Sequence, residues 1–401
     1  KEVQRILSFL MPREASVFYF SEETHLLEVQ FDYLVFNNQV GFLKDIQTTF
    51  EEIKKQAYLN SRLVIVCQNS FWKPAIKLAE FLGFKGKSLE QTWLGFNDLQ
   101  NFLGLAGFEV IKRGEGILCP FYFPLVSGLL NRFLVHLPLL RRLGLAQVIV
   151  ARPQGLTNQE DKQSMASIII PARNEQGNIE VAVQRLLNFP APFEIIFVEG
   201  HSKDDTLQEI KRVQKKYPKV VIKVLGQDGV GKGDAVRKGF EYAMGEVLMI
   251  LDADLTMPPE ELPKFYWALV NNKADFINGS RLVYPLQKHS MQFLNVLGNK
   301  FFGAMFSWLL GQKIKDTLCG TKVLWKKDYE AIKKGRTFFG DFDPFGDFDL
   351  LFGASKLNLK IIDLPIRYQE RTYGQTNIQR FKHGWLLLKM VLFAMRKIKF
   401  I

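Results

Sequence analysis

Two aspartates that flank a single alanine give the clearest chemical signal in the chain. Asp252 and Asp254 come directly after the apolar run at residues 247–250, which predicts a buried strand. Side chains alternate along extended backbone, so both carboxylates point to the same side of the strand end. Mg²⁺ in proteins commonly takes one or two carboxylates together with substrate phosphates. The pair therefore predicts a site for a divalent cation and a phosphate, and two solvated loop aspartates are the alternative.

Three more polar segments follow predicted strands in the same half of the chain. Residues 171–175 come after the apolar run at residues 168–170, and Glu199 comes at the end of another apolar run. The segment at residues 229–233 contains three glycines around Lys232, which lets backbone approach phosphates closely. Nucleotides bind at such strand ends in α/β sheets. Helix capping is the alternative for Asn174 and for Ser202 and Asp204, which follow Glu199, and Glu175 could be a first-turn acid.

These side chains must be positioned by an α/β fold, because apolar runs alternate with helix-length segments in two parts of the chain. We expect two doubly wound, Rossmann-like domains with parallel sheets. The polar stretch at residues 153–165 predicts a linker between them. The predicted domains are residues 1–152 and 166–380, followed by a basic amphipathic tail at residues 381–401. Strands are expected at residues 31–36, 62–66, 108–111, 148–151, 167–170, 194–198, 220–224 and 247–251, and a helix at residues 45–58.

Composition narrows the class of protein further. The 401 residues carry 53 Lys and Arg against 41 Asp and Glu, a net charge of +12, and 47% are hydrophobic, which excludes disordered and collagen-like sequences. The 3 cysteines include no CxxC pair, which excludes a disulfide scaffold and a cysteine-rich metal site. Residues 1–5 show no signal-peptide pattern, and no run reaches the roughly 18 apolar residues of a spanning helix. We therefore expect a cytoplasmic protein.

The four strand-end segments, in this order and ending at Asp254, resemble glycosyltransferase family 2, whose members are inverting enzymes with a GT-A fold. The resemblance covers about residues 166–380 and implies a nucleotide-sugar donor and Mg²⁺ or Mn²⁺. It departs at Gly200, where many members carry a second acid, so no role is assigned there. The resemblance implies that Pro171, Ala172, Glu175, Glu199, Lys232 and Asp252 border the nucleotide-sugar, and that Asp252 and Asp254 hold the metal.

Later motifs look like the branch of dolichyl-phosphate mannose and glucose synthases. They lie at residues 279–281, 315–322, 345–351, 364–368 and 371–376. The resemblance implies transfer from a UDP- or GDP-linked sugar to a polyprenyl phosphate or another lipid-linked acceptor, as in cell-envelope glycan biosynthesis. A soluble saccharide acceptor is the alternative.

Arg281 and Arg371, which belong to these later motifs, are candidates to hold the acceptor phosphate, because arginine binds phosphate in a bidentate manner. A surface salt bridge is the alternative for each. Where the family has an acid pair, this chain has Asp347 and Asp349, which become candidates for the catalytic base in that order. A phosphate acceptor needs no strong base, and helix-start acids are the alternative role.

Two apolar segments with basic flanks suggest contact with a membrane surface. Residues 291–310 are rich in Phe and Leu, and residues 381–401 end in Arg396, Lys397 and Lys399. Beyond Pro365 the chain carries eight basic residues and one acid. We expect interfacial helices on an anionic leaflet, at the cytoplasmic face, with core helices or a homodimer face as the alternative. No stacking or helix-turn-helix motif indicates nucleic-acid binding.

The first part of the chain, at residues 31–151, resembles the carboxyl-terminal half of a class I S-adenosylmethionine-dependent methyltransferase. The resemblance lies in residues 31–35, 61–65, 93–99 and 106–110. The family's cofactor loop is glycine-rich, but residues 15–21 contain no glycine. We therefore expect a shortened domain that serves as a scaffold and does not bind S-adenosylmethionine. A methyltransferase, a bifunctional methyl and glycosyl transferase, a nucleotidyltransferase and a non-catalytic binding module are the alternative functions.

Overall fold

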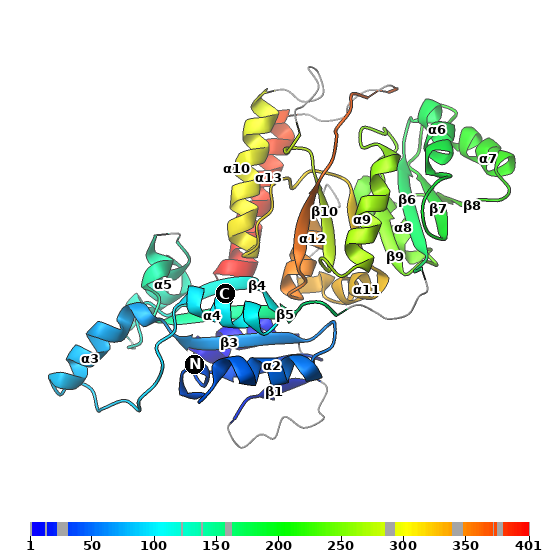
Figure 1. Cartoon of the computed structure of the whole chain (residues 1–401). Helices are drawn as coiled ribbons and strands as arrows, with labels where there is room; N and C mark the ends of the chain where they lie inside the picture. The colour runs from blue at the N-terminus through cyan, green and yellow to red at the C-terminus, as the bar shows by residue number, and fades with distance from the viewer. Residues whose placement is uncertain are drawn as a thin grey trace. The chain divides into compact units, whose positions relative to one another are not determined.

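The computed structural model divides the chain into two compact units, which Figure 1 shows as ribbons. Unit 1 comprises residues 1–157 and 395–401, and unit 2 comprises residues 158–394. The structure describes every residue except 1, 13, 22–30, 122, 138, 157–162, 285–292, 339–347, 372, 375–379 and 401.

The described part of unit 1 contains a five-stranded sheet in the order β1-β2-β3-β5-β4. β1 (Val17–Tyr19), β2 (Tyr33–Asn37) and β3 (Arg62–Gln68) are parallel. The expectation of a wholly parallel sheet was wrong, because β5 (Ala146–Pro153) lies antiparallel between β3 and β4 (Phe108–Gly116). The connection from β4 returns to β5 at the same end of the sheet, so no crossover is needed.

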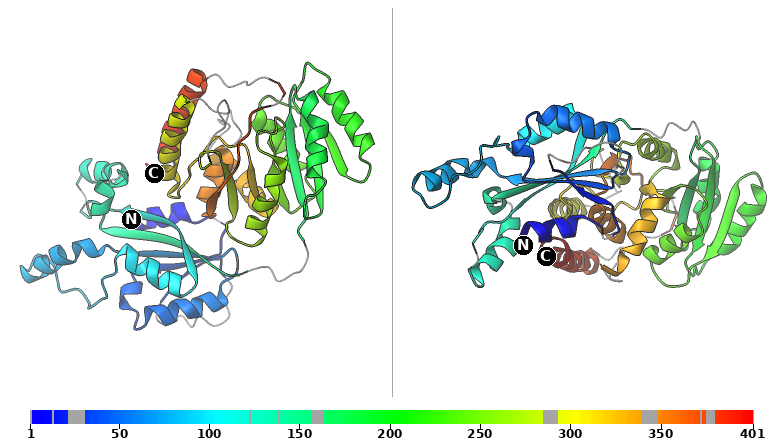
Figure 2. Two further views of the ribbon diagram at one scale, coloured as in Figure 1. Left: turned by 45° about the horizontal axis from the view of Figure 1, so that its top comes forward. Right: turned by 90° about the horizontal axis from the view of Figure 1, so that it is seen from below.

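Alternation along the strands of unit 1 builds an apolar layer on each face of the sheet. Leu34 and Phe36 of β2 pack with α2 (Ile46–Gln56) and α4 (Phe96–Leu105), and Tyr33 and Val35 pack with α1 (Glu2–Leu10). Two further helices, α3 (Lys73–Phe81) and α5 (Val126–Arg132), project from one end of the sheet (Figures 1 and 2).

The described part of unit 2 contains a seven-stranded sheet in the order β12-β10-β11-β9-β6-β7-β8. Four strands lie where the sequence predicts them: β6 (Ala166–Ala172), β7 (Phe193–Glu199), β8 (Val221–Gly226) and β9 (Val247–Ile250). These four are parallel, as expected. β11 (Lys322–Trp325) is antiparallel to both β9 and β10 (Phe276–Ser280), so this sheet is also mixed, and β12 (Ile361–Pro365) forms its edge.

Helices cover both faces of the unit 2 sheet, which is why all four residues of β9 are buried. The layer helices are α6 (Gln176–Leu186), α7 (Thr206–Lys216), α8 (Lys232–Glu241), α9 (Leu262–Val270), α11 (Lys326–Lys334) and α12 (Phe348–Lys356). α11, α12 and the last three strands were not expected from the sequence, and they lie among the apolar and basic segments of the carboxyl-terminal third.

The two expected interfacial segments form α10 (Phe293–Leu310) and α13 (Arg380–Ala394), which pack against each other. Phe306 of α10 stacks on Phe352 of α12, with 5.5 Å between the ring centroids. Trp385 and Leu392 of α13 are exposed, whereas Leu387 is buried. One side of each helix therefore belongs to the core, and membrane contact by these segments stays a prediction. Within the described residues, no helix has the length and apolar character needed to cross a membrane.

α8 lies close to β6, and this close approach fixes the position of Lys232 at the start of α8. The packing of α8 on β6 can be tested at Gly239. A β-carbon at this position would lie 2.5 Å from Cγ2 of buried Ile169. We expect Gly239→Ala to lower the free energy of unfolding by about 1–3 kcal/mol, although alanine is the better helix former. Gly298→Ala on α10 is the control, because no described atom lies within 4 Å of its β-carbon position. Equal thermal unfolding midpoints for the two variants would contradict this packing.

Candidate functional site

The carboxyl ends of three neighbouring strands bring the predicted site residues together. Ala172 at the end of β6 is paired with Glu199 at the end of β7. β9 lies on the other side of β6, where Ile250 is paired with Ile169, and its chain continues into Asp252. The parallel strands β6, β7 and β9 thus end at one edge of the sheet, which is the arrangement that the strand-end motifs predict.

The loops after β6 and β7 hold each other through side chain to backbone hydrogen bonds. The backbone N–H of Lys203 donates to Oδ1 of Asn174 over 2.7 Å, and the N–H of Asn174 donates to Oγ of Ser202 over 3.0 Å. The N–H of Ser202 in turn donates to Oε1 of Glu199 over 2.6 Å. One carboxylate oxygen of buried Glu199 thus helps to shape the loop. Half-buried Pro171 and buried Ala172 form the adjoining strand end.

Asp252 is paired with the lysine of the glycine-rich segment. Lys232 is the first residue of α8, and its Nζ lies 2.6 Å from Oδ1 of Asp252. Burial opposes the charged form of the carboxyl, but the Lys232 ammonium prevails and lowers the pKa of Asp252. A β-carbon on Gly320 would collide with both charged groups. Gly320 lies within the motif at residues 315–322, and no role was expected for it from the sequence.

Asp254 and Glu175 share a second cation, Arg371. Nη2 of Arg371 donates to Oδ2 of Asp254 over 2.7 Å, and Nη1 donates to Oε1 of Glu175 over 2.9 Å. The N–H and the hydroxyl of Thr256 donate to the other oxygen of Asp254, over 3.1 and 2.8 Å. Asn178 donates to Oε2 of Glu175 over 2.7 Å. The arginine predicted to hold an acceptor phosphate therefore bridges a predicted metal ligand and a predicted donor-site acid.

Glu175 is buried beside Asp254 and Arg371. Burial raises its pKa, against the opposing effects of the Arg371 guanidinium and the Asn178 amide. The neighbouring Asp254 carboxylate also favours the protonated form. Any cation that approaches Asp254 and Glu175 must compete with Arg371 for these oxygens.

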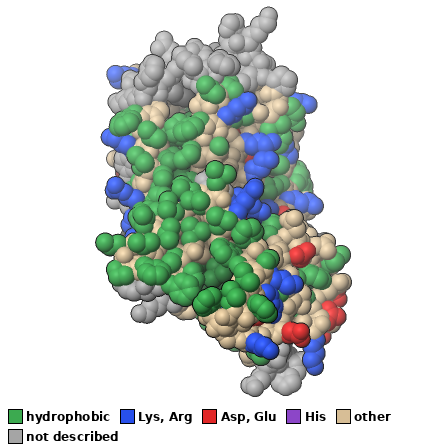
Figure 3. Space-filling view, turned by 90° about the vertical axis from the view of Figure 1, so that its left-hand side faces the viewer, with side chains coloured by type: hydrophobic (Ala, Val, Ile, Leu, Met, Phe, Trp, Pro, Cys, Tyr) green, Lys and Arg blue, Asp and Glu red, His purple; other side chains and the backbone are tan. Residues whose placement is uncertain are grey.

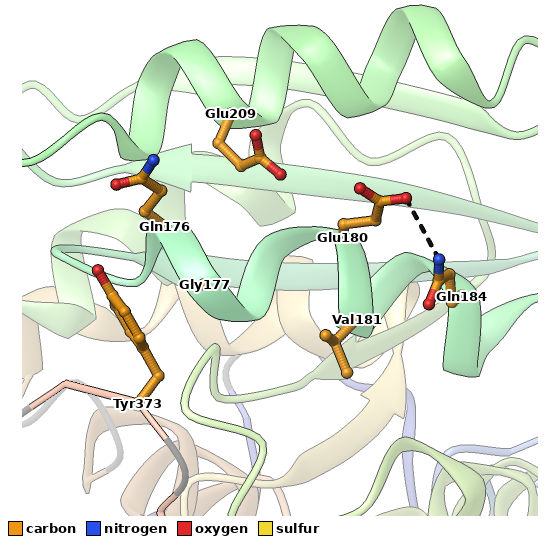
Figure 4. Close-up of a pocket in the computed structure, with 7 residues that line it drawn as sticks. All are labelled: Gln176, Gly177, Glu180, Val181, Gln184, Glu209 and Tyr373. Carbon is orange, nitrogen blue, oxygen red and sulfur yellow. Dashed lines mark hydrogen bonds between the residues drawn. The ribbon is translucent and has the colours of Figure 1, made fainter.

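A polar pocket lies beside this cluster, between α6 and α7 (Figure 4). The Tyr373 ring closes one end, next to Gly177, where a β-carbon would lie 2.6 Å from Cδ2 of the ring. At the other end Nε2 of Gln184 donates to Oε1 of Glu180 over 3.2 Å. Only glycine at position 177 therefore lets the chain after Arg371 pack against the start of α6.

Arg281, the other candidate for the acceptor phosphate, lies in a buried ion pair. Its Nε and Nη2 donate to the two carboxylate oxygens of Asp316 over 2.7 and 2.8 Å, and its backbone N–H also donates to Asp316. Asp316 is fully buried, and Arg281 is 9% exposed. The edge of the guanidinium formed by Nε and Nη2 is therefore already taken by a carboxylate. Such a position is typical of a group that fixes the end of β10.

The first candidate base, Asp347, lies outside the described residues, together with Asp341 and Asp343. Asp349 is described and lies in the first turn of α12. Its Oδ2 lies 3.3 Å from Nε of Arg336 and 3.7 Å from Nη1 of Arg237. Two guanidinium groups therefore face this carboxyl, which suits an acid that orients a neighbour.

The donor set fits a hard divalent cation that arrives with phosphate oxygens. Asp252 and Asp254 offer carboxylate oxygens, the ligand type that Mg²⁺ and Mn²⁺ prefer. Among the described residues, no group of three or more His, Cys, Asp and Glu side chains is placed to hold a metal ion. Two carboxylates alone leave most of the coordination shell to water and substrate, which is common for Mg²⁺.

Comparison with known proteins identifies the class of the second unit. Residues 167–331 match the model of glycosyl transferase family 2, so this part of the chain is a domain of that family. Dolichol-phosphate mannosyltransferase of Pyrococcus furiosus is 29% identical over 238 residues, which are 56% of this chain and 63% of that protein. Undecaprenyl-phosphate 4-deoxy-4-formamido-L-arabinose transferase of Pectobacterium carotovorum is 35% identical over 102 residues, 24% of this chain and 31% of that protein. The chain thus spans less than two thirds of either relative.

A solved structure also aligns with part of the chain. Glucosyl-3-phosphoglycerate synthase from Mycobacterium tuberculosis, crystallised with Mn²⁺, uridine diphosphate and glucosyl-3-phosphoglycerate, gives a TM-score of 0.44 at 15% identity. The alignment covers 59% of this chain and 80% of that chain. The family expected from the sequence motifs is confirmed for residues 167–331 by the family model, whereas the methyltransferase resemblance of residues 31–151 stays a prediction.

The buried pair of Arg281 and Asp316 gives a test of stability. Asp316→Ala leaves a buried guanidinium without its carboxylate, so we expect a loss of about 3–5 kcal/mol in the free energy of unfolding. The double variant Arg281→Met with Asp316→Leu removes both charges and is expected to regain most of that loss. Urea unfolding of the three proteins measures this. Wild-type stability in Asp316→Ala would show that the pair does not support the fold.

Proposed function

We propose that the chain is an inverting glycosyltransferase that moves a sugar from a UDP- or GDP-linked donor to a polyprenyl phosphate or similar lipid-linked acceptor. The observation that carries the proposal is the cluster of Asp252, Asp254, Glu175 and two cations at the strand ends of a glycosyl transferase family 2 domain. The names of the two transferase relatives support the acceptor class.

In this proposal the donor lies across the ends of β6 and β7, with Pro171, Ala172, Glu175 and Glu199 beside its nucleotide. The diphosphate lies toward Lys232, whose position at the start of α8 adds the positive end of the helix dipole to its own charge. Asp252 and Asp254 would hold Mg²⁺ or Mn²⁺, which neutralises the leaving diphosphate when bound. Arg371 would then exchange its carboxylate partners for an anionic group of a substrate.

The reaction exchanges one carbon–oxygen bond for another. An acceptor oxygen attacks the anomeric carbon of the sugar from the face opposite the diphosphate, and the bond to the leaving phosphate oxygen breaks with its electron pair. The nucleoside diphosphate leaves as an anion beside Lys232. A phosphate acceptor carries no proton that must be removed. For a hydroxyl acceptor, the proton would pass to Asp347, with Asp349 as the second candidate.

The donor-site aspartates are tested by conservative substitution. Because Asn keeps the shape but removes the charge, we expect Asp252→Asn and Asp254→Asn to lower transfer at least about hundredfold while the thermal midpoint stays close to that of the wild type. Asp228→Asn is the matched control, since Asp228 is exposed and lies in the adjacent loop. The measurement is release of nucleoside diphosphate from a panel of nucleotide-sugars, with and without a polyprenyl phosphate in detergent. Full activity of the wild type after removal of divalent cations with a chelator would contradict the proposal that Asp252 and Asp254 hold a metal ion.

Unit 1 is proposed to be a scaffold without methyltransferase activity. β1 is present next to β2, but the residues around it supply no glycine loop for a cofactor. Calorimetric titration of the full chain with S-adenosylmethionine is therefore expected to show no binding heat, in parallel with an active methyltransferase that does. A clear micromolar isotherm would overturn the scaffold role and favour a bifunctional enzyme.

A further inference from the structure

Unit 1 carries a projecting segment whose large apolar side chains face solvent. This segment, called the α5 segment, runs from residue 121 to residue 143 and includes α5; residues 122 and 138 in it are not described. Leu125 is 91% exposed and Leu139 is 84% exposed, at its two ends. The other apolar residues of the segment that are exposed are Phe121, Phe123, Val126, Leu129, Phe133, Leu137 and Leu143. Exposed apolar residues gathered in this way mark an interaction surface.

The charged side chains within the α5 segment have one sign. The sequence contains no Asp or Glu from residue 116 to residue 159, whereas Arg132, Arg141 and Arg142 lie within the segment. Arg132 and Arg142 are exposed. Figure 3 views the side on which α5 lies in Figure 1 and shows many hydrophobic side chains with Lys and Arg among them, and Asp and Glu at its lower right. The surface therefore combines apolar insertion groups with positive charge.

The α5 segment is held firmly at its base, so its exposure is not the result of a loose loop. The backbone N–H of Cys119 donates to Oδ1 of buried Asn131 over 2.8 Å, and Nδ2 of Asn131 donates back to the Cys119 carbonyl over 2.7 Å. Nε1 of Trp72 donates to the carbonyl of Leu143 over 2.9 Å. The middle of the segment is thus joined to Cys119, which lies two positions before the segment begins, and its carboxyl end is joined to Trp72.

Residues 395–400, which belong to unit 1, contact this segment. Nε of Arg132 donates to the carbonyl of Phe400 over 2.9 Å, and the rings of Phe133 and Phe400 lie 5.0 Å apart between centroids. Burial lowers the pKa of Lys399 to about 8, and the nearby Arg141 acts in the same direction while Glu115 opposes it. Residues 395–400 therefore pack as part of unit 1 behind the α5 segment.

We propose that the α5 segment is a membrane-docking element that inserts its leucines and phenylalanines into the interface of an anionic lipid leaflet. The segment projects outward, so a protein partner would need a matching groove, whereas a lipid interface accepts a convex apolar surface. The arginines match the negative potential of such a leaflet. This assigns a role to unit 1, and it rests on the described residues of unit 1 rather than on the proposed glycosyl transfer.

Vesicle sedimentation of the full chain without nucleotide-sugar tests the proposal. We expect binding to phosphatidylglycerol-containing vesicles, weaker binding to phosphatidylcholine alone, and at least about tenfold weaker partitioning of the Leu125→Asp, Leu139→Asp double variant. Both side chains are exposed, so the thermal midpoint is expected to stay unchanged. Leu105→Asp on α4, whose side chain is 59% exposed, is the matched control and is expected to bind as the wild type does.

Two results would overturn the proposal. In the first, the Leu125→Asp, Leu139→Asp variant binds vesicles as strongly as the wild type does. The same conclusion follows if a Trp385→Asp, Leu392→Asp variant of α13 loses vesicle binding instead. In the second, sedimentation velocity without lipid shows a dimer that the Leu125→Asp, Leu139→Asp variant dissociates, which would make the α5 segment a protein interface. Release of nucleoside diphosphate in detergent is expected to be equal in the double variant and the wild type. A protein that lacks transfer activity but still binds vesicles through this segment would refute only the proposed function.

Discussion

The pairing of acids with cations at the strand ends is the interaction that organises unit 2. Asp252 meets Lys232, and Asp254 and Glu175 meet Arg371. Carboxylates grouped this closely at a half-buried sheet edge would repel one another without these partners. In the proposed function the same oxygens would hold a divalent cation, so Lys232 and Arg371 occupy positions that such a cation would take. The price is competition between the internal cations and any incoming one.

The elements that position these acids could be predicted from sequence because each of them is a local signal. The strands β6, β7 and β9 are continuous apolar runs, which parallel strands buried on both faces require. The position of Asp252 at the end of such a run then places it at the carboxyl edge. The antiparallel direction of β5 and β11 could not be predicted in this way, because it depends on the connections that precede these strands rather than on their own residues.

The parts of the site that could not be predicted come from distant segments. Arg371 was assigned to an acceptor, yet it contacts Asp254 and Glu175, which no spacing rule connects to it. Gly320 could be picked out only as a glycine in a motif, because the collision that excludes a side chain there exists only once β11 lies beside β9. Asp316 likewise became the partner of Arg281 through the packing of the residues that precede β11.

The composition of unit 1 from two separated stretches of chain has a consequence for biosynthesis. Residues 395–400 pack into unit 1, although all of unit 2 lies between them and residue 157. A ribosome therefore delivers the amino-terminal sheet first, then an entire second domain, and only then the piece that covers Phe133 and His136. Until that moment the rings of Phe133 and His136 lack this neighbour, so the amino-terminal unit exposes more apolar surface during translation than it does in the complete fold.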